Sequence, residues 1–416
     1  MGNRRRSDRG QLEQRLLILV TLGLVAFGLV MVFSATSASA ALGEGDPMRF
    51  LVKQGLYAGA GLVLLAVLTR VDYHALRPLA PALLLGAFLA CVAVLAVAPP
   101  INGAHRWFTY GPVSVQPAEI AKLAVCLWVC AVLARRPVPT TMGELMNPVG
   151  VVVVVFGGLI VVEPDLGTTI SLFLMVAGIL LVSGIPLRLF ALASAFAVGA
   201  GLLAIWMEPY RRERVFSFLD PWQDAQGAGF QNVQAIIGMG SGGVTGEGLG
   251  QGIQKVNFLP EAHTDMIFAV VGEELGFVGS TLVIAAFAVF AWAGFRIALQ
   301  CRDPFGKRLA AGITTLVCGQ AAVNLAAVLG IAPLTGIPLP FVSYGGSSLL
   351  VLLAGVGVLL NIAVNERVVE ARVRDRGRGN GRSRSSRSRG RGGAARPRSD
   401  GDVRRHSRPR RVAAGA

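Results

Sequence analysis

The chain has 416 residues, of which 53% are hydrophobic and only 15% charged, and its mean hydropathy is +0.59. This composition excludes an ordinary soluble domain with a polar coat and indicates a membrane protein. The formal net charge is +15, but sixteen arginines and three aspartates in residues 371–416 account for +13 of it. The rest of the chain is close to neutral, so we expect no nucleic-acid partner for it.

Apolar runs long enough to cross a bilayer, about 20 residues each, recur along the chain up to residue 365. The first run lacks a small-residue cleavage site, so we expect it to stay as the first span. The fifth and sixth runs are separated only by "EPDLGT", which leaves one broken helix as an alternative to two. The pattern predicts an all-α polytopic membrane protein with about ten transmembrane helices, at residues 15–36, 50–69, 77–98, 117–134, 148–163, 165–183, 187–207, 265–295, 309–332 and 340–364.

Lysine and arginine predict the orientation, because they are retained in the cytoplasm. They are more frequent on the side of the two termini, which we therefore place in the cytoplasm. Residues 1–14 form a basic N-terminus, and residues 15–365 form the transmembrane domain. Residues 366–416 form an Arg-rich cytoplasmic tail whose Gly and Ser content predicts disorder. Anionic lipid headgroups would attract this tail, with a specific partner or RNA as the alternative.

The connections are short except for residues 208–264, on the predicted outer face. A connection of this length is usually functional or disordered, and apolar pieces such as "FLDPW" (Phe218 to Trp222) favour order. We therefore expect one large ordered extracytoplasmic loop. Within it, residues 238–252 hold eight glycines, which permit positive φ and close approach of the backbone to a ligand or to another loop.

Ionisable side chains inside apolar spans are costly unless they are paired or face water, so they are candidates for a functional site. Glu119 and Lys122 can form an i,i+3 pair near the outer end of the fourth predicted helix. Either the pair fixes helix packing, or Lys122 faces an anionic ligand. Asp165 follows Glu163 and Pro164, where proline interrupts an apolar stretch and exposes a helix end to a cavity.

Further carboxylates lie at the start of the eighth predicted helix. Asp265 follows Thr264, a candidate N-cap, so we expect Asp265 in the first helical turn, where the helix dipole favours the ionised carboxylate. Glu273 and Glu274 lie deeper in the same helix and need partners or water.

A basic cluster precedes this helix in the long loop. Arg211, Arg212 and Arg214 either end the seventh span or bind phosphate, which forked guanidinium groups do well. Together with carboxylates at membrane level and an ordered loop, the cluster predicts an outer-leaflet site for an anionic, lipid-borne substrate.

Six segments between residues 33 and 350 form a distinctive set in a fixed order: "FSATSASA", "NGAHRWFTYGPVSVQPAEIAKLA", "EPDLGTT", "YRRERVFSFLDPWQDAQGAGFQNVQAIIGMGSGGVTGEGLGQG", "LPEAHTDMIFAVVGEELGFVG" and "TGIPLPFVSYGGSSLL". In these segments the sequence resembles the SEDS family (shape, elongation, division and sporulation), whose members polymerise bacterial peptidoglycan. The pieces "EPDLGTT", "YRRER" and "LPEAHTD" are closer to the cell-division branch of the family than to its elongation branch.

The resemblance implies an inverting glycosyltransferase that polymerises lipid II, the undecaprenyl-pyrophosphate-linked disaccharide pentapeptide, in septal cell-wall synthesis. The 4-hydroxyl of the acceptor sugar attacks the anomeric carbon of the donor, and undecaprenyl pyrophosphate leaves. Asp265 matches the essential acid of the family and is the expected general base. The cations expected to stabilise the leaving pyrophosphate are Lys122, Arg211, Arg212 and Arg214.

The resemblance extends to other residues and to partners. Glu119, Asp165 and His263 are expected at the substrate site. A divalent cation, Mg²⁺ or Mn²⁺, could share the charge stabilisation, with Asp265 as a candidate ligand. The expected partners are a class B penicillin-binding protein with transpeptidase activity and other divisome proteins, at the septum of the bacterial plasma membrane.

Three alternatives remain open at this point. The chain could be an elongation-type polymerase, or a lipid II flippase that uses the broken fifth–sixth helix as a site at the middle of the membrane. It could also be a scaffold that only recruits a transpeptidase, in which case Glu119, Lys122 and Asp265 would tolerate substitution.

Overall fold

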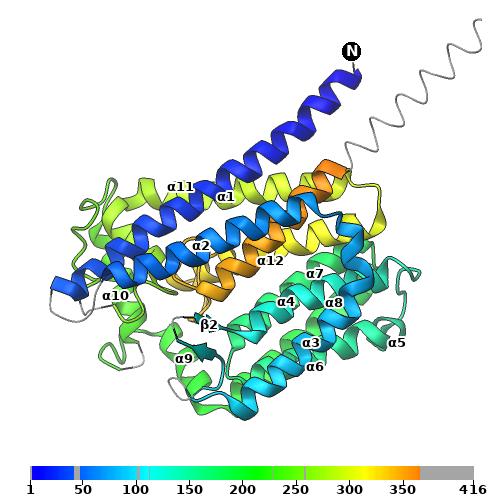
Figure 1. Cartoon of the computed structure of the whole chain (residues 1–416). Coiled ribbons are helices and arrows are strands. Elements are labelled where there is room, and N and C mark those ends of the chain that lie inside the picture. Colours follow the sequence, from blue (N-terminus) through cyan, green and yellow to red (C-terminus); the bar gives the residue numbers. More distant parts are fainter. Residues whose placement is uncertain are drawn as a thin grey trace, which may run out of the picture. The chain divides into compact units, whose positions relative to one another are not determined.

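The computed structural model describes residues 2–41, 47–100, 104–111, 113–227, 229–256 and 259–365, which belong to one compact unit, Met1–Arg367. The predicted Arg-rich tail lies outside the described residues. The described part of the chain is almost entirely helical (Figure 1), and nine of its helices are long and apolar enough to cross a membrane. The prediction of an all-α polytopic membrane protein is confirmed.

Helices lie at all ten predicted positions. Nine of them are the membrane-length helices just mentioned. The remaining one, α4, has 17 residues and is slightly shorter than those nine spans. A short helix α5 (Met142–Leu145) and the turn η2 (Met146–Gly150) precede α6 and complete its span. The ten helices are α1 (Gly2–Ala41), α2 (Pro47–Arg70), α3 (Leu76–Val97), α4 (Pro117–Leu133), α6 (Val151–Val162), α7 (Leu166–Ser183), α8 (Leu187–Met207), α11 (Ile267–Gln300), α12 (Pro304–Val328) and a last, unlabelled helix, Gly346–Asn365.

Helix boundaries differ from the predicted ones where polar residues begin a helix. The helix α12 begins five residues before the predicted span, because Pro304 occupies its first turn and the Asp303 side chain accepts a hydrogen bond from the Gly306 amide. The spans Met142–Val162, which ends with α6, and Leu166–Ser183, which is α7, are separate and each is long enough to cross a membrane, so the alternative of one broken helix is wrong.

The long loop is ordered over its described residues, as predicted. It contains α9 (Pro209–Leu219) and α10 (Phe230–Ser241), which lie at one end of the bundle in Figure 1. A short antiparallel hairpin, β1 (Phe108–Tyr110) and β2 (Val113–Val115), lies at the same end and was not predicted. We call this end of the bundle the loop end.

The glycine-rich part of the loop has the predicted positive φ values, but its backbone approaches the helix α11 rather than a ligand or another loop. The helix is interrupted at Gly276, whose φ is 64°. Amides of Phe277 and Val278 then donate to loop carbonyls of residues 243 and 244 at 2.9 and 3.1 Å. A side chain on Gly246 would collide with the Glu274 carbonyl, so glycine is required for this contact.

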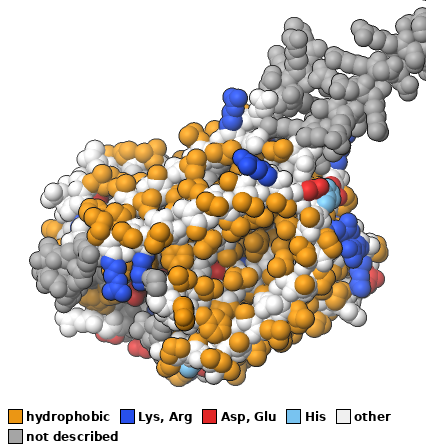
Figure 2. All heavy atoms as spheres, in the orientation of Figure 1, with side chains coloured by type: hydrophobic (Ala, Val, Ile, Leu, Met, Phe, Trp, Pro, Cys, Tyr) orange, Lys and Arg blue, Asp and Glu red, His pale blue; other side chains and the backbone are white. Residues whose placement is uncertain are grey.

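Burial separates central from peripheral helices. The apolar window of the last helix is 83% buried and that of α12 is 67% buried, whereas α8 is only 6% buried. Figure 2 shows hydrophobic side chains over most of the visible face, with Lys and Arg mainly toward its ends. Such an apolar surface suits helices that face lipid.

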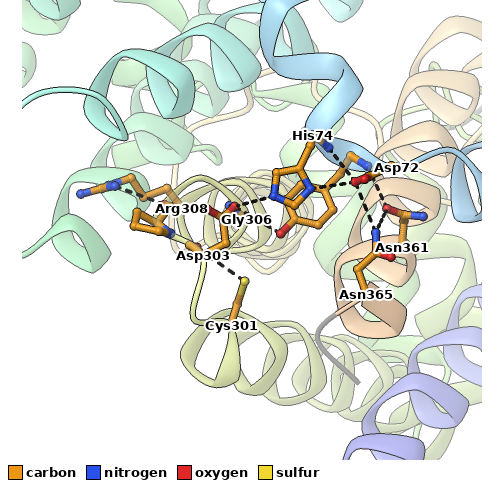
Figure 3. Close-up of polar contacts among 10 residues, drawn as sticks. Asp72, His74, Cys301, Asp303, Gly306, Arg308, Asn361 and Asn365 are labelled. Atoms are coloured by element: carbon orange, nitrogen blue, oxygen red, sulfur yellow. Dashed lines mark hydrogen bonds and ion pairs between the residues drawn. The ribbon is translucent and has the colours of Figure 1, made fainter. Parts of the chain in front are cut away.

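A polar cluster joins three segments at the end opposite the loop end (Figure 3). His74, in the turn between α2 and α3, has its Nδ1 atom 2.8 Å from Asp72 Oδ1 and its Nε2 atom 3.5 Å from Asp303 Oδ2. Asn361 of the last helix accepts from the Tyr73 amide at 2.9 Å and donates to the Thr69 carbonyl at 2.8 Å. These contacts fix the α2–α3 turn against the rest of the bundle.

Candidate functional site

Asp265 lies in a turn at the loop end, just before α11. The turn is closed by the Thr264 amide, which donates to the Glu261 carbonyl at 3.0 Å. The helix begins at Ile267 and no side chain caps it. The prediction that Thr264 caps the helix is wrong, because its hydroxyl donates to Glu261 and to Asp265 Oδ1, at 2.8 and 3.2 Å from their carboxylate oxygens.

The surroundings of Asp265 raise the pKa of its carboxyl to about 6. Burial is the largest cause and the Glu261 charge is the second, whereas Arg214 of α9 favours the ionised form. Because α11 begins at Ile267, Asp265 lies before the first helical turn, and the prediction that places it within that turn is wrong. A carboxyl that titrates near neutral pH can accept a proton and release it again, which suits a general base.

Lys122 and Glu119 form the predicted ion pair, 2.9 Å apart, and both side chains are buried. The ammonium also donates to Gln320 Oε1 of α12 at 3.1 Å. The second Glu119 oxygen, Oε2, is buried without a hydrogen-bond partner. In this conformation Lys122 connects α4 to α12, so direct contact with a pyrophosphate would require it to exchange one of these partners.

Two amide side chains on α12 connect the Lys122 pair to the Asp265 turn. Gln320, which accepts from Lys122, lies four residues before Asn324 on the same face of α12. Asn324 donates to the Asp265 backbone carbonyl at 2.7 Å. The structure thus joins two predicted site residues through two residues that the sequence did not single out.

Asp165 is the N-cap of α7. Its carboxylate accepts from the Thr168 amide at 2.9 Å, from the Thr168 hydroxyl at 2.8 Å and from Gln116 Nε2 at 2.9 Å. The two bonds from Thr168 cap the helix start, and the bond from Gln116 holds it against the segment that follows the hairpin. Asp165 therefore positions α7 at the loop end, and its substrate contact stays a prediction.

Glu163, next to this cap, is fully buried and neither carboxylate oxygen has a hydrogen-bond partner. Burial, followed by the charge of Asp165, raises the pKa of Glu163 to about 8. Arg106 covers the adjacent backbone by donating to the carbonyls of Glu163 and Pro164, at 2.7 and 2.5 Å. The break between α6 and α7 is thus closed by protein groups.

The three arginines of the predicted cluster point to different places. Arg211 donates to the carbonyls of Ala204 and Val161, at 3.0 and 2.8 Å. Arg212 stacks over the ring of Trp206, 5.6 Å from its centroid. Only Arg214 influences Asp265. The structure therefore does not bring the three together as one phosphate site.

His263 packs within an aromatic group. Its ring lies 5.0 Å from Phe50 of α2 and 5.6 Å from Tyr344, and its carbonyl accepts from the Tyr344 amide at 2.9 Å. Burial lowers the pKa of His263, which favours its neutral form. His263 shapes the turn that carries Asp265.

Glu273 and Glu274 hold the loop to α11. Glu273 Oε1 accepts from the amides of Ile253 and Gln254, at 2.6 and 3.0 Å. Glu274 pairs with Lys255 and accepts from Ser34 of α1 at 2.7 Å. Both glutamates therefore brace the loop.

The described residues do not form a metal site from protein ligands alone. Asp265 and Glu261 belong to one turn, but no group of three or more His, Cys, Asp or Glu residues in the described part of the chain could hold a metal. The predicted Mg²⁺ or Mn²⁺ stays a prediction, because such an ion can be held by one or two carboxylates together with substrate phosphates.

The bundle, the buried ion pair and the titratable carboxyl at the loop end define a multi-pass membrane protein with a site at one end of its helices. The sequence pattern of the cell cycle protein family that includes FtsW, RodA and SpoVE matches residues 14–368. The chain belongs to this family.

Named relatives agree with this assignment. The chain is 39% identical over 357 residues to a probable peptidoglycan glycosyltransferase FtsW of Shewanella sediminis, covering 85% of this chain and 87% of the relative. It is 38% identical to the stage V sporulation protein E of Bacillus subtilis, covering 84% and 96%.

Solved structures share the fold. One chain of a peptidoglycan synthase complex that coordinates polymerization and crosslinking superposes with a TM-score of 0.70 at 31% identity, covering 84% of this chain and 97% of that one. The rod shape determining protein RodA of Thermus thermophilus superposes with a TM-score of 0.63 at 28% identity, covering 84% and 96%.

Proposed function

We propose that this chain is a peptidoglycan glycosyltransferase of the FtsW type, which polymerises lipid II into glycan strands during cell division. The observation that carries the proposal is the Asp265 carboxyl, whose pKa of about 6 suits it for proton transfer at the end of a membrane-spanning bundle. Relatives named as probable peptidoglycan glycosyltransferases support the choice of substrate.

In the proposed reaction, Asp265 removes the proton from the acceptor sugar 4-hydroxyl. The oxygen then attacks the anomeric carbon of the donor, the bond from that carbon to the pyrophosphate oxygen breaks, and the configuration inverts. The positive charge of Arg214 is close enough to Asp265 to lower the pKa of its carboxyl. Arg214 is therefore the first candidate to stabilise the departing pyrophosphate.

The proposal places the loop end on the outer face of the bacterial plasma membrane at the division septum, with both termini in the cytoplasm. The proposed partner is a class B penicillin-binding protein that crosslinks the new strands. The similarity to a chain from a complex that couples polymerization to crosslinking supports this partner.

The described residues do not contain the broken helix on which the flippase alternative depends. This alternative requires a break at the middle of the membrane, but residues 163–165 connect two spans, Met142–Val162 and Leu166–Ser183, that are each long enough to cross. Arg106 occupies the backbone carbonyls of Glu163 and Pro164, and the Asp165 carboxylate caps α7. These contacts favour polymerisation over transport.

The test uses the full chain purified with its transpeptidase partner and supplied with labelled lipid II. We expect glycan polymer from the native chain and none above background from Asp265→Asn, which keeps the shape of the side chain but cannot accept the proton. Asp303→Asn is the matched control, because it changes a capping carboxylate at the opposite end of the bundle and we expect polymer from it. Lipid transfer across liposomes without polymer would support the transporter.

A further inference from the structure

Two uncharged side chains, Gln320 and Asn324, occupy the face of α12 that lies between the Lys122 pair and the Asp265 turn. Both are buried, with exposed fractions of 0% and 2%. A carboxamide in the interior of a membrane-spanning helix is costly unless its hydrogen bonds are satisfied. The hydrogen bonds that Gln320 and Asn324 make therefore indicate their role.

Asn324 makes two hydrogen bonds with its amino group. The nitrogen Nδ2 donates to the carbonyl of Asp265 at 2.7 Å and to the carbonyl of Ile337 at 2.8 Å. Because both neighbours are acceptors, only the amino end of the carboxamide fits this position. The side chain thus connects the turn before α11 to the segment between α12 and the last helix.

Gln320 makes the corresponding contacts one helical turn earlier, about 6 Å along the axis. Its oxygen accepts from Lys122 at 3.1 Å, and its nitrogen donates to the carbonyl of Pro338 at 3.1 Å. The two side-chain amides therefore donate to the adjacent carbonyls of residues 337 and 338. Gln320 also accepts from Lys122, and Asn324 also donates to the Asp265 carbonyl.

We propose that Asn324 is a positioning residue for the glycosyltransferase reaction, which fixes Asp265 through its backbone carbonyl, while Gln320 fixes Lys122 in the same frame. This inference rests on the proposed function. Asn324 does not contact the Asp265 carboxylate; it holds the carboxylate in its partly buried position. A shift of about 1 Å in a reacting group can lower a rate by about 100-fold.

The groups that act on the Asp265 carboxylate come from three directions. Glu261 and the Thr264 hydroxyl belong to its own turn, and Arg214 belongs to α9. The segment before the last helix is the third, where a Cβ added to Gly336 would lie 3.9 Å from Oδ2. Loss of the Asn324 contact would let the turn move toward water. The Asp265 pKa would then fall from about 6 toward its ordinary value, because burial is the main cause of its elevation.

The test measures lipid II polymerisation against pH for the native chain, Asn324→Ala and a control, each in complex with the transpeptidase partner. For Asn324→Ala we expect kcat to fall by about tenfold or more, with KM changed less than about threefold. We also expect the acid limb of the pH–rate profile, where the rate falls as the base is protonated, to move to lower pH by about half a unit or more. The control is Thr314→Ala, on the same helix, whose buried hydroxyl donates only within the helix, to Ala310. We expect its acid limb to coincide with that of the native chain.

A purely structural role would lower the amount of active enzyme and leave the acid limb in place, and that result would overturn the proposal. Native rates from Asn324→Ala would overturn it too. If Asn324→Ala does not fold, Asn324→Ser, which keeps one donor, is judged on the same shift of the acid limb. Absence of polymer from the native chain would instead contradict the proposed function, so the two failures are distinguishable.

Discussion

The Nζ atom of Lys255, in the long loop, lies 2.6 Å from Oε1 of Glu274, inside α11, and both side chains are almost completely buried. The Ser34 hydroxyl of α1 also donates to this carboxylate. The pair therefore connects three segments that are far apart in the sequence, and it holds the loop that leads into the Asp265 turn.

Removing only one partner of the Lys255–Glu274 pair should lower the stability of the protein. Lys255→Ala leaves the Glu274 carboxylate buried without its cation, and such a change destabilises proteins by about 3–5 kcal/mol. We expect a clear fall in the unfolding temperature of the purified protein in detergent. The double variant Lys255→Met, Glu274→Leu removes both charges and should recover most of the loss; a double variant as unstable as the single one would contradict the account.

The pH dependence of polymerisation should follow the charges around Asp265. The base must be ionised, so the rate should fall as pH decreases through about 6. Glu261→Gln removes a neighbouring negative charge and should move the acid limb to lower pH. Arg214→Gln removes a positive charge and should move it to higher pH. Shifts of the same sign in the two variants would show that these charges do not act on the titrating group.

The docking of the glycine-rich loop should fail when a side chain is added at its contact with α11. Gly246 has a φ of +81° and its Cβ would meet the Glu274 carbonyl, so Gly246→Ala should release the loop. Limited proteolysis should then cut within residues 242–256 faster than in the native chain. Gly240→Ala is the control, because a Cβ there meets nothing within 4 Å; equal cleavage of both variants would count against the docking role.

The cluster at the opposite end should contribute to stability without taking part in the reaction. Asn361→Ala removes the hydrogen bonds that this side chain makes with the Tyr73 amide and the Thr69 carbonyl, and each such bond contributes about 0.5–1.5 kcal/mol to stability. We expect a lower unfolding temperature and an unchanged polymerisation rate per folded molecule. A changed acid limb in this variant would show coupling between the two ends that the contacts do not provide.

Most of the fold could be predicted from the sequence because apolar runs of membrane-spanning length leave few alternatives. Helix boundaries were less predictable, since the polar turn that begins α12 carries no hydropathy signal. The hairpin at residues 108–115 was also missed, because three-residue strands lack a clear alternation.

The charged residues of the candidate site could be predicted from the sequence, whereas its two carboxamide side chains were not. Glu119 and Lys122 could be paired from their spacing, whereas the partners of Glu273 and Glu274 lie in a loop whose path no local pattern gives. Gln320 and Asn324 carry no charge, so a search of the spans for ionisable groups does not find them. Uncharged carboxamides four residues apart on one apolar helix are a signal that could have found them.

The arginines show a different limit. Three neighbouring guanidinium groups in the sequence suggested one phosphate site, but residues 211, 212 and 214 point in different directions from α9. Side-chain direction on a helix depends on its tertiary contacts, which spacing alone does not determine.

The most direct test of the central claim is the rate of lipid II polymerisation by the Asp265→Asn variant in complex with the transpeptidase, compared with the native chain at neutral pH. The account predicts that glycan polymer is lost while the variant keeps the native unfolding temperature. Polymer formed at the native rate would show that another group takes the proton and would contradict the assignment of Asp265.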